Sequence, residues 1–379
     1  MHRTRRAFIG GGIAALLIVS GAMVALGQAR TPTLPPVTPA SLIASVLRAT
    51  AADPTISGEV VATVDLGIPD LPAEAPSLSG PASILQAIQG VHRIRVWRSP
   101  GGLRIAELLP AAERSLWISR TDVWTWDSRS FTALHAGQFP EAGTESPAAP
   151  GAITGRVPDA LASPFDPLGL ARAALAAIGQ TTSVSVGTSS RVAGRACYVL
   201  VVVPRDAGTL VGRVEVAVDA ERRLPLGVEV FARGADSPSV SVRFGSVGFS
   251  PIDPSTFRFS PPSGARVVRP APPALLPAES GRPARPGTNP ITEYLPGFAG
   301  SVRVFGRDWS SVLAVRMATP PPGTANAGAP RFDVGGLQRL LPFSGPLFSV
   351  RLEPRGDHEW LLVGAVPQSA LVRAGADLT

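Results

Sequence analysis

The stretch 211–230 reads VGRVEVAVDAERRLPLGVEV, and the alternation within it decides the fold. Apolar and charged residues alternate along its first half: one side of the strand carries Val214, Val216 and Val218, and the other carries Arg213, Glu215 and Asp219. Successive side chains of a strand point to opposite faces, so this strand has one dry face and one wet face. Such a strand is typical of an antiparallel sheet that is packed on one side.

The same pattern extends in both directions along the chain. Short alternating runs are separated by tight turns such as Pro100-Gly101-Gly102 and Ser128-Arg129, which predicts an antiparallel meander. A polar stretch rich in proline and glycine, 137–164, divides the meander and is interpreted as a long loop. The predicted strands are 56–66, 92–98, 103–108, 114–119, 122–127 and 130–135 before the loop, and 183–186, 196–203, 210–219, 224–233 and 240–249 after it.

Three helices are predicted to accompany the meander. The first covers 38–50 and begins with Thr38 as N-cap and Pro39 at the first position. The second is expected at 81–89, where Gly90 ends it, and the third at 166–178, opened by Asp166-Pro167. Each helix carries an apolar stripe. We therefore expect an α+β domain over 38–268 in which one curved antiparallel sheet has all three helices on its concave side.

The C-terminal part is separated from this domain by proline. Seven prolines between 270 and 290 predict a semi-rigid linker over 269–290. Residues 291–379 are predicted to form a small α/β domain that packs as a separate unit. Its expected strands are 301–305, 310–316, 347–353 and 359–366, and its expected helices are 333–341 and 367–374.

The N-terminus predicts export. Arg3, Arg5 and Arg6 precede an uncharged run, 7–26, which is long enough to cross a bilayer. Cations before such a run stay in the cytoplasm, so the rest of the chain is expected outside it. Residues 1–30 are either a cleaved signal peptide or an uncleaved signal anchor, and the sequence leaves export by the general or the twin-arginine route open.

Composition excludes several classes of function. All 35 basic residues are arginine, so no mechanism that needs a lysine is possible. Four of the seven net positive charges belong to residues 1–30, and the remainder shows no basic run, so nucleic-acid binding is not expected. The single cysteine, Cys197, lies in a strongly apolar strand and is interpreted as an inert core thiol. No nucleophile, metal or cofactor motif is present, and we expect neither an enzyme nor a cofactor.

Tryptophan is concentrated in the first half of the meander. Trp124 and Trp126 are two residues apart, so they share one face of their strand, and Trp97 and Trp117 lie on neighbouring strands. Large aromatic side chains are usually part of a core. An apolar cavity between the sheet and the helices is the alternative.

Three motifs together resemble the LolA-type lipoprotein-carrier superfamily, which includes LolA-, LolB- and RseB-like proteins, and in particular its exported or anchored actinobacterial members. They are Leu116–Asp127, with the pattern strand, turn, strand; the hairpin at 214–230; and the segment Phe257–Val268, which closes the domain and is called the closing segment below. The resemblance covers 38–268. It implies an unclosed antiparallel β-barrel whose concave face is covered by helices, with an apolar space that takes acyl chains. A related branch, the RseB/MucB type, implies a sensor that contacts a membrane-bound regulator.

The resemblance implies two functions. The first is an extracytoplasmic carrier-like protein that binds lipid acyl chains or a lipidated protein. The second is a membrane-anchored, RseB-like sensor that binds a membrane protein through the C-terminal unit. For the first, strand alternation suggests an apolar ligand site walled by Trp124, Trp126, Val216, Val228, Val242 and Phe244.

Overall fold

The computed structural model describes residues 31–68, 89–119, 122–138, 166–269, 302–317, 341–355 and 358–378. The described residues after Thr31 belong to one compact unit. Several predicted segments lie outside these ranges: the signal or anchor at 1–30, most of the loop at 137–164 and the linker after 269. The helices predicted at 81–89 and 333–341 also lie outside them, apart from the last residue of each. No helix within the described ranges is long and apolar enough to span a membrane.

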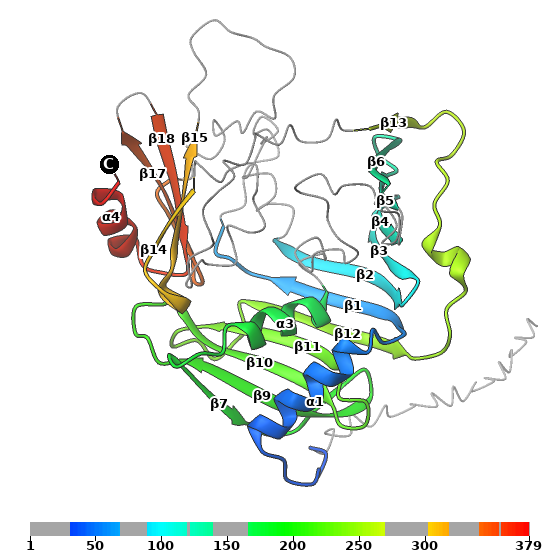
Figure 1. The fold of residues 1–379 in the computed structure, drawn as a ribbon, viewed down its shortest axis with the longest axis horizontal. Helices are drawn as coiled ribbons and strands as arrows, with labels where there is room; N and C mark the ends of the chain where they lie inside the picture. Colours follow the sequence, from blue (N-terminus) through cyan, green and yellow to red (C-terminus); the bar gives the residue numbers. More distant parts are fainter. Residues whose placement is uncertain are drawn as a thin grey trace, which may run out of the picture. The chain divides into compact units, whose positions relative to one another are not determined.

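The described residues contain a sheet of thirteen strands that does not close on itself (Figure 1). Its order is β13-β6-β5-β4-β3-β2-β1-β12-β11-β10-β9-β7, and β8 pairs with β9. The strands are β1 Ile56–Val64, β2 Gly90–Ser99, β3 Gly102–Leu109, β4 Ala112–Ser119, β5 Asp122–Asp127, β6 Thr132–Gln138, β7 Thr182–Val186, β8 Ser190–Val192, β9 Arg195–Pro204, β10 Val211–Asp219, β11 Pro225–Ala232, β12 Val240–Gly248 and β13 Arg266–Val268. The predicted unclosed meander is confirmed.

One edge of this sheet differs from the prediction. After β12 the chain passes through a short 3-10 helix, η2 (Pro254–Phe257), and then adds β13 to the edge strand β6. The two strands run parallel, with Val267 opposite Ala133. The sheet is therefore mixed and not wholly antiparallel. The reason is that the closing segment crosses several strands before it pairs, so no tight turn reverses its direction at β6.

The β10–β11 hairpin shows how the alternating sequence builds the sheet. Val216 lies directly opposite Val228, so that apolar side chains of the two strands share a face. The carboxylate of Asp219 accepts hydrogen bonds from the backbone N–H groups of Glu221 and Arg222, at 3.1 and 2.6 Å. The side chain at the end of one strand thus fixes the turn into the next.

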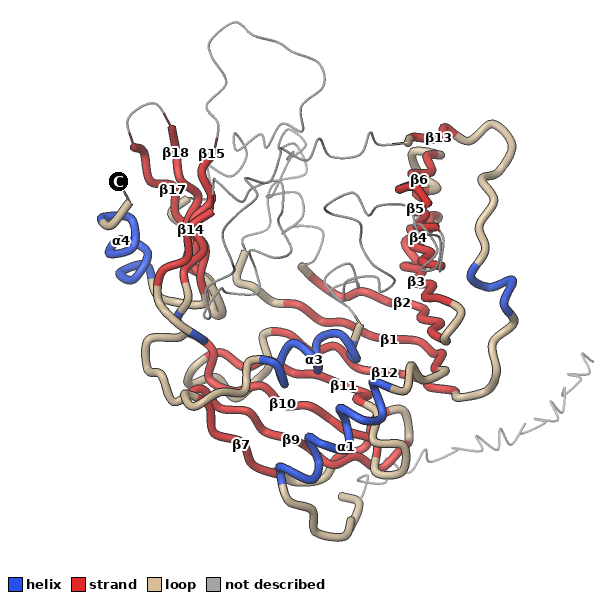
Figure 2. Tube along the Cα trace, in the orientation of Figure 1, coloured by secondary structure: helices blue, strands red, loops and turns tan. Residues whose placement is uncertain are grey.

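Two described helices cover one face of the large sheet (Figures 1 and 2). Helix α1 (Pro39–Ala51) begins at the predicted N-cap Thr38, and α3 (Pro167–Ala176) begins at the N-cap Asp166. The contacts of α3 are mainly with β11 and β12, whereas α1 contacts α3 and β7. We call the face that these helices cover the inner face and the opposite one the outer face. Both helices lie on the same face, as predicted.

The C-terminal part is a second sheet with five described strands in the order β14-β15-β18-β17-β16. Its neighbours are all antiparallel, and one helix, α4 (Gln368–Ala376), packs on it, so the predicted α/β unit is corrected to an antiparallel sheet with a helix. The prediction missed the shortest strand, which has two residues. The strands are β14 Val302–Phe305, β15 Val312–Met317, β16 Phe343–Ser344, β17 Ser349–Arg355 and β18 His358–Gly364.

The two faces of this small sheet pack differently. On one face, Leu362 and Trp360 form a core with Leu371 of α4. Side chains of β16 and β17, among them Phe343 and Val350, belong instead to the core that covers the inner face of the large sheet. The division of the chain into domains at 38–268 and 291–379 remains a prediction.

Candidate functional site

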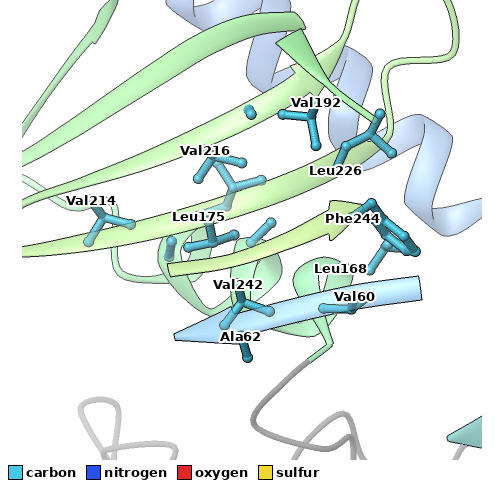
Figure 3. Close-up of a cluster of buried hydrophobic side chains, with 14 of the residues drawn as sticks. Val60, Ala62, Leu168, Leu175, Val192, Val214, Val216, Leu226, Val242 and Phe244 are labelled. Atoms are coloured by element: carbon cyan, nitrogen blue, oxygen red, sulfur yellow. The ribbon is translucent and has the colours of Figure 1, made fainter. Parts of the chain in front are cut away.

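The inner face of β10–β12 carries four of the six predicted site residues. Val216, Val228 and Val242 lie opposite one another on adjacent strands, and Phe244 lies opposite Val60 of β1. Each of these side chains is at most 2% exposed. Figure 3 shows Val216, Val242 and Phe244 in the same cluster as Leu168 and Leu175 of α3. The structure therefore brings these four together, as a packed core beneath the helices.

The same apolar face continues over β2–β5. Register extends it strand by strand, because Val60 lies opposite Ile94, and Val96 opposite Ile105. The helix contacts, in contrast, are concentrated on β7, β11 and β12. The buried inner-face side chains beyond them are Ile94, Val96, Leu103, Ile105, Ile118 and Val123. Sequence reasoning did not select them, although their two-residue spacing within β2 and β3 was a sufficient signal.

A buried ion pair joins this region to α3. Asp166 is 1% exposed, and its carboxylate accepts the backbone N–H of Leu168 at 3.1 Å and a guanidinium N–H of Arg98 at 3.2 Å. Arg98 is on β2, opposite Ile56 and Leu103, so its side chain lies on the inner face. A buried charge needs such a partner, and the pair therefore fixes the start of α3 against β2.

The two tryptophans of the predicted wall lie on the other side of the sheet. Trp124 pairs with Trp117, whereas the inner-face residue Val123 pairs with Ile118. Because successive residues of a strand face opposite ways, Trp124 and Trp126 belong to the outer face. They share no surface with Val216 and its three neighbours, so the structure does not assemble the six predicted residues into one wall.

A row of aromatic and basic side chains crosses the outer face instead. Register places Trp97, Arg104, Trp117, Trp124 and His135 in line on five successive strands. The Arg104 guanidinium lies 4.8 Å from the centre of the Trp97 ring and 5.1 Å from that of Trp117. The Trp124 and His135 rings stack with their centres 4.0 Å apart. This row is a structural element of the sheet, and its planar groups stabilise one another.

The closing segment covers this row. The Phe259 ring contacts Trp117, Trp124 and Trp126, and Phe257 packs near Gly102 at the start of β3. In Figure 1 the segment between β12 and β13 passes β3–β6 on the side away from α1 and α3. The three tryptophans therefore pack against the closing segment of the same chain.

The described residues offer little for catalysis or metal binding. They contain no group of three or more histidine, cysteine or acidic side chains placed to hold a metal ion. Cys197 is buried, and this burial raises the pKa of its thiol to about 11. A thiol with such a pKa is protonated at neutral pH and is a poor nucleophile. The interpretation as a core thiol fits this environment.

No protein-family model and no curated protein matches the sequence. Several solved structures are similar to it. The complex of MucA and MucB from Pseudomonas aeruginosa is 14% identical over 89% of this chain and 96% of the matched chain, with a TM-score of 0.42. A crystal structure of MucB is 16% identical over 89% of this chain and 97% of the other, with a TM-score of 0.42. A LolA superfamily protein from Nitrosomonas europaea is 11% identical over 59% of this chain and 99% of its own, with a TM-score of 0.22.

The chain is similar in structure to MucB and to a LolA-superfamily protein, as the motifs predict, at low sequence identity and with TM-scores below 0.5. This similarity carries no conclusion about a ligand.

Proposed function

We propose that this chain is an extracytoplasmic binding protein for an acyl chain, carried either by a lipid or by a lipidated protein. The observation that carries the proposal is the apolar inner face of β2–β5, which extends beyond the strands on which α1 and α3 pack. The ligand site is assigned to this extension and not to the tryptophans. Val216, Val228, Val242 and Phe244 border it as the floor beneath the helices.

The physical basis is burial of hydrocarbon. Leu103 and Ile105 of β3, together with Ile118 of β4, carry branched aliphatic side chains on this face. All three are buried, so an acyl chain lying across the strands would take the place of contacts that bury them. Each methylene that leaves water contributes about 0.8 kcal/mol. An acyl chain of about ten carbons would therefore retain useful affinity after the cost of ordering it.

Native mass spectrometry of the full chain, purified from its extracytoplasmic location, tests this proposal. We expect a population that carries co-purified lipid and that can be reloaded with palmitate. Ile105→Ala should lower the loaded fraction per folded molecule, because it removes contact surface from the inner face. Trp124→Ala is the matched control: it truncates a larger side chain on the outer face of the same sheet and should leave the loaded fraction unchanged.

Two outcomes contradict the assignment. A wild-type chain that shows only its own mass, and does not take up palmitate, argues against a lipid ligand altogether. A chain that loses lipid with Trp124→Ala but not with Ile105→Ala places the ligand on the outer face.

A second candidate is a membrane-anchored sensor that binds a protein partner through the C-terminal sheet. It is favoured by one feature: Phe343 and Val350 of this sheet belong to the same core as the inner face of the large sheet. A partner held by the C-terminal sheet would then be coupled to whatever occupies that face. A clean apo mass, together with specific capture of a membrane protein that is lost on deleting 302–379, would favour this candidate over the first.

A further inference from the structure

Exposed apolar side chains gather at one end of the large sheet. The β3–β4 and β5–β6 turns are neighbours there, because Arg114 near the start of β4 pairs with Asp127 at the end of β5. Four large apolar side chains at this end are exposed: Val91 by 67%, Leu108 by 45%, Phe131 by 44% and Val267 by 36%. Only two other large apolar side chains among the described residues are as exposed. We call this end of β2–β6 and β13 the rim.

The apolar side chains of the rim share one surface. Strand alternation and register put Val91, Leu108 and Val267 on the outer face. Phe131, in the β5–β6 turn, packs edge-on against Trp126 of that face, with ring centres 5.2 Å apart. These residues lie along six adjacent strands, β2 to β6 and β13. Five inter-strand spacings of about 4.8 Å make the apolar border roughly 24 Å long.

Positive charge accompanies this border. Arg95, Arg129 and Arg266 are exposed, and none of them forms an ion pair with a described residue. Three neighbouring carboxylates are paired with other arginines: Glu59 with Arg93, Glu113 with Arg104 and Asp127 with Arg114. A fourth, Glu107, pairs with His92. The rim therefore presents three arginines that form no ion pair with a described residue.

Turn chemistry does not account for Phe131. Its φ is +49°, in the left-handed region where glycine, asparagine or aspartate is favoured and a bulky residue is unusual. Asp127 already holds the turn, since its carboxylate accepts the backbone N–H groups of Arg129 and Ser130 at 2.8 and 3.3 Å. The ring packs on Trp126 but stays 44% exposed, so contacts within the molecule use only part of its apolar surface and the rest is open to a partner.

We propose that the rim docks on the surface of a bilayer that contains anionic phospholipids. Exposed aliphatic and aromatic side chains beside unbalanced arginines are the combination that binds the interfacial region of a membrane: the apolar groups enter the acyl boundary, and the cations face the headgroups. Trp126, next to Phe131, is of the residue type that is enriched at this depth. A docked rim would hold β3–β6 end-on to the membrane.

This inference goes beyond the proposed function. The proposed acyl-chain site is on the inner face, whereas the rim is formed by strand ends and outer-face residues, so either can exist without the other. Docking requires only that the exported chain meets a membrane surface. A failure of docking would leave the loaded fraction in mass spectrometry unaffected, and the two proposals can therefore fail separately.

Hydrogen–deuterium exchange of the full chain, reconstituted in vesicles, tests the docking. One vesicle preparation is phosphatidylcholine alone, and the other contains phosphatidylglycerol as well. We expect the amides of 108–113, 128–133 and 264–268 to exchange several-fold more slowly in the anionic vesicles at about 0.01 M salt than at about 0.15 M. Peptides of α1 serve as the internal reference. Helix α1 packs on β7, which is at the opposite end of the strand order from β13.

Substitutions separate charge from apolar contact. Arg129→Gln with Arg266→Gln should reduce the ratio of docked to undocked molecules about 25-fold, since each arginine near an anionic surface accounts for about fivefold. Leu108→Ser with Phe131→Ser should reduce the ratio at either salt concentration. The matched control is Leu47→Ser with Arg48→Gln on α1, where a leucine exposed by 49% precedes an exposed arginine. This control should leave rim protection unchanged.

Three results would overturn the proposal. One is equal protection of the rim in both vesicle types. Another is a loss of protection with the Leu47 and Arg48 control that matches the loss with the rim variants. The third is concentration-dependent self-association in solution that is abolished by the Leu108 and Phe131 variant while vesicle protection persists, which would make the rim a contact between copies of this chain.

Discussion

The Phe259 ring stacks on the Trp117 ring, with ring centres 4.2 Å apart and an angle of 24° between their planes. This contact joins the closing segment to the middle of the outer face, far along the chain from β4. It explains why tryptophans are concentrated in β2–β5: the sheet needs a second apolar surface to receive a segment that has no other core. The closing segment thus covers the outer face where Phe259 stacks on β4.

Phe259→Ala is expected to lower the free energy of unfolding by about 1–3 kcal/mol, less than a fully buried phenylalanine because Phe259 is half-buried. Urea unfolding followed by tryptophan fluorescence measures this cost. Phe131→Ala is the comparison: its ring is 44% exposed and has one aromatic partner, Trp126, so the variant should cost less than Phe259→Ala. Equal costs for the two variants would show that the closing segment is not fastened by this stack.

A second prediction concerns the buried pair Asp166 and Arg98. Asp166→Ala removes the cap of α3 and also leaves the Arg98 guanidinium without its buried partner. It should therefore lower the free energy of unfolding by about 3–5 kcal/mol. Asp166→Asn keeps an oxygen for the Leu168 N–H and should cost about 1 kcal/mol less. Denaturant unfolding of both variants checks this. Identical losses would mean that capping contributes nothing.

The sequence was informative where the two faces of a strand differ. In β10 the charged side chains of Arg213 and Glu215 mark the wet face, so alternation assigns Val216 to the dry one without ambiguity. In β4 both faces are apolar, with Ile118 on one and Trp117 on the other. Alternation shows that such residues are on opposite faces, but not which face receives the helices. This ambiguity explains the wrong placement of the tryptophans.

Pairing over long distances was also beyond the sequence. The parallel pairing of β13 with β6 depends on where the closing segment emerges after crossing the outer face, which no local turn signal encodes. Similarly, nothing in the sequence of β16 and β17 indicates that Phe343 packs on a core built by residues more than a hundred positions earlier. Propensity and periodicity describe single strands, whereas these contacts depend on tertiary packing.

A third prediction is a pH dependence from Asp219. Burial raises the pKa of this carboxyl, but hydrogen bonds from Arg195 and from the backbone of Arg222 and Glu221 outweigh burial and hold the pKa below its ordinary value of 3.8. The folded state therefore binds the proton more weakly than the unfolded chain. The resulting stabilisation is complete above the unfolded pKa and is lost as pH falls through the folded one.

Asp219→Asn should accordingly cost about 1–3 kcal/mol at neutral pH and flatten the fall in stability at acid pH. Urea unfolding of wild type and variant at several pH values between about 6 and 3 measures the difference. The gap between the two proteins should narrow as the pH is lowered. A gap that stays constant over this range would contradict the assigned role of the Asp219 charge.

The final prediction concerns the joint between the two sheets. Leu347 of the C-terminal part belongs to the core on the inner face, and Gly345 closely approaches the backbone of Leu66, so close that a side chain there would meet its carbonyl oxygen. The indole N–H of Trp309 donates to the hydroxyl of Thr182 at 2.9 Å, and the backbone N–H of Leu210 donates to the Ala365 carbonyl at 2.7 Å. Protease cleavage within 270–290 should therefore leave two pieces that co-elute in gel filtration.

Leu347→Ala should weaken this association by about 2–4 kcal/mol, because it removes apolar volume from the shared core. Leu371→Ala is the matched control, because it truncates a buried leucine of α4 in the separate core between α4 and the small sheet. It should destabilise the C-terminal piece without reducing its affinity for the N-terminal piece. Gel filtration of the cleaved protein over a dilution series distinguishes the two effects. If the wild-type pieces separate at once and each remains folded, then 38–268 and 291–379 are independent domains and the shared core contributes little to holding them together.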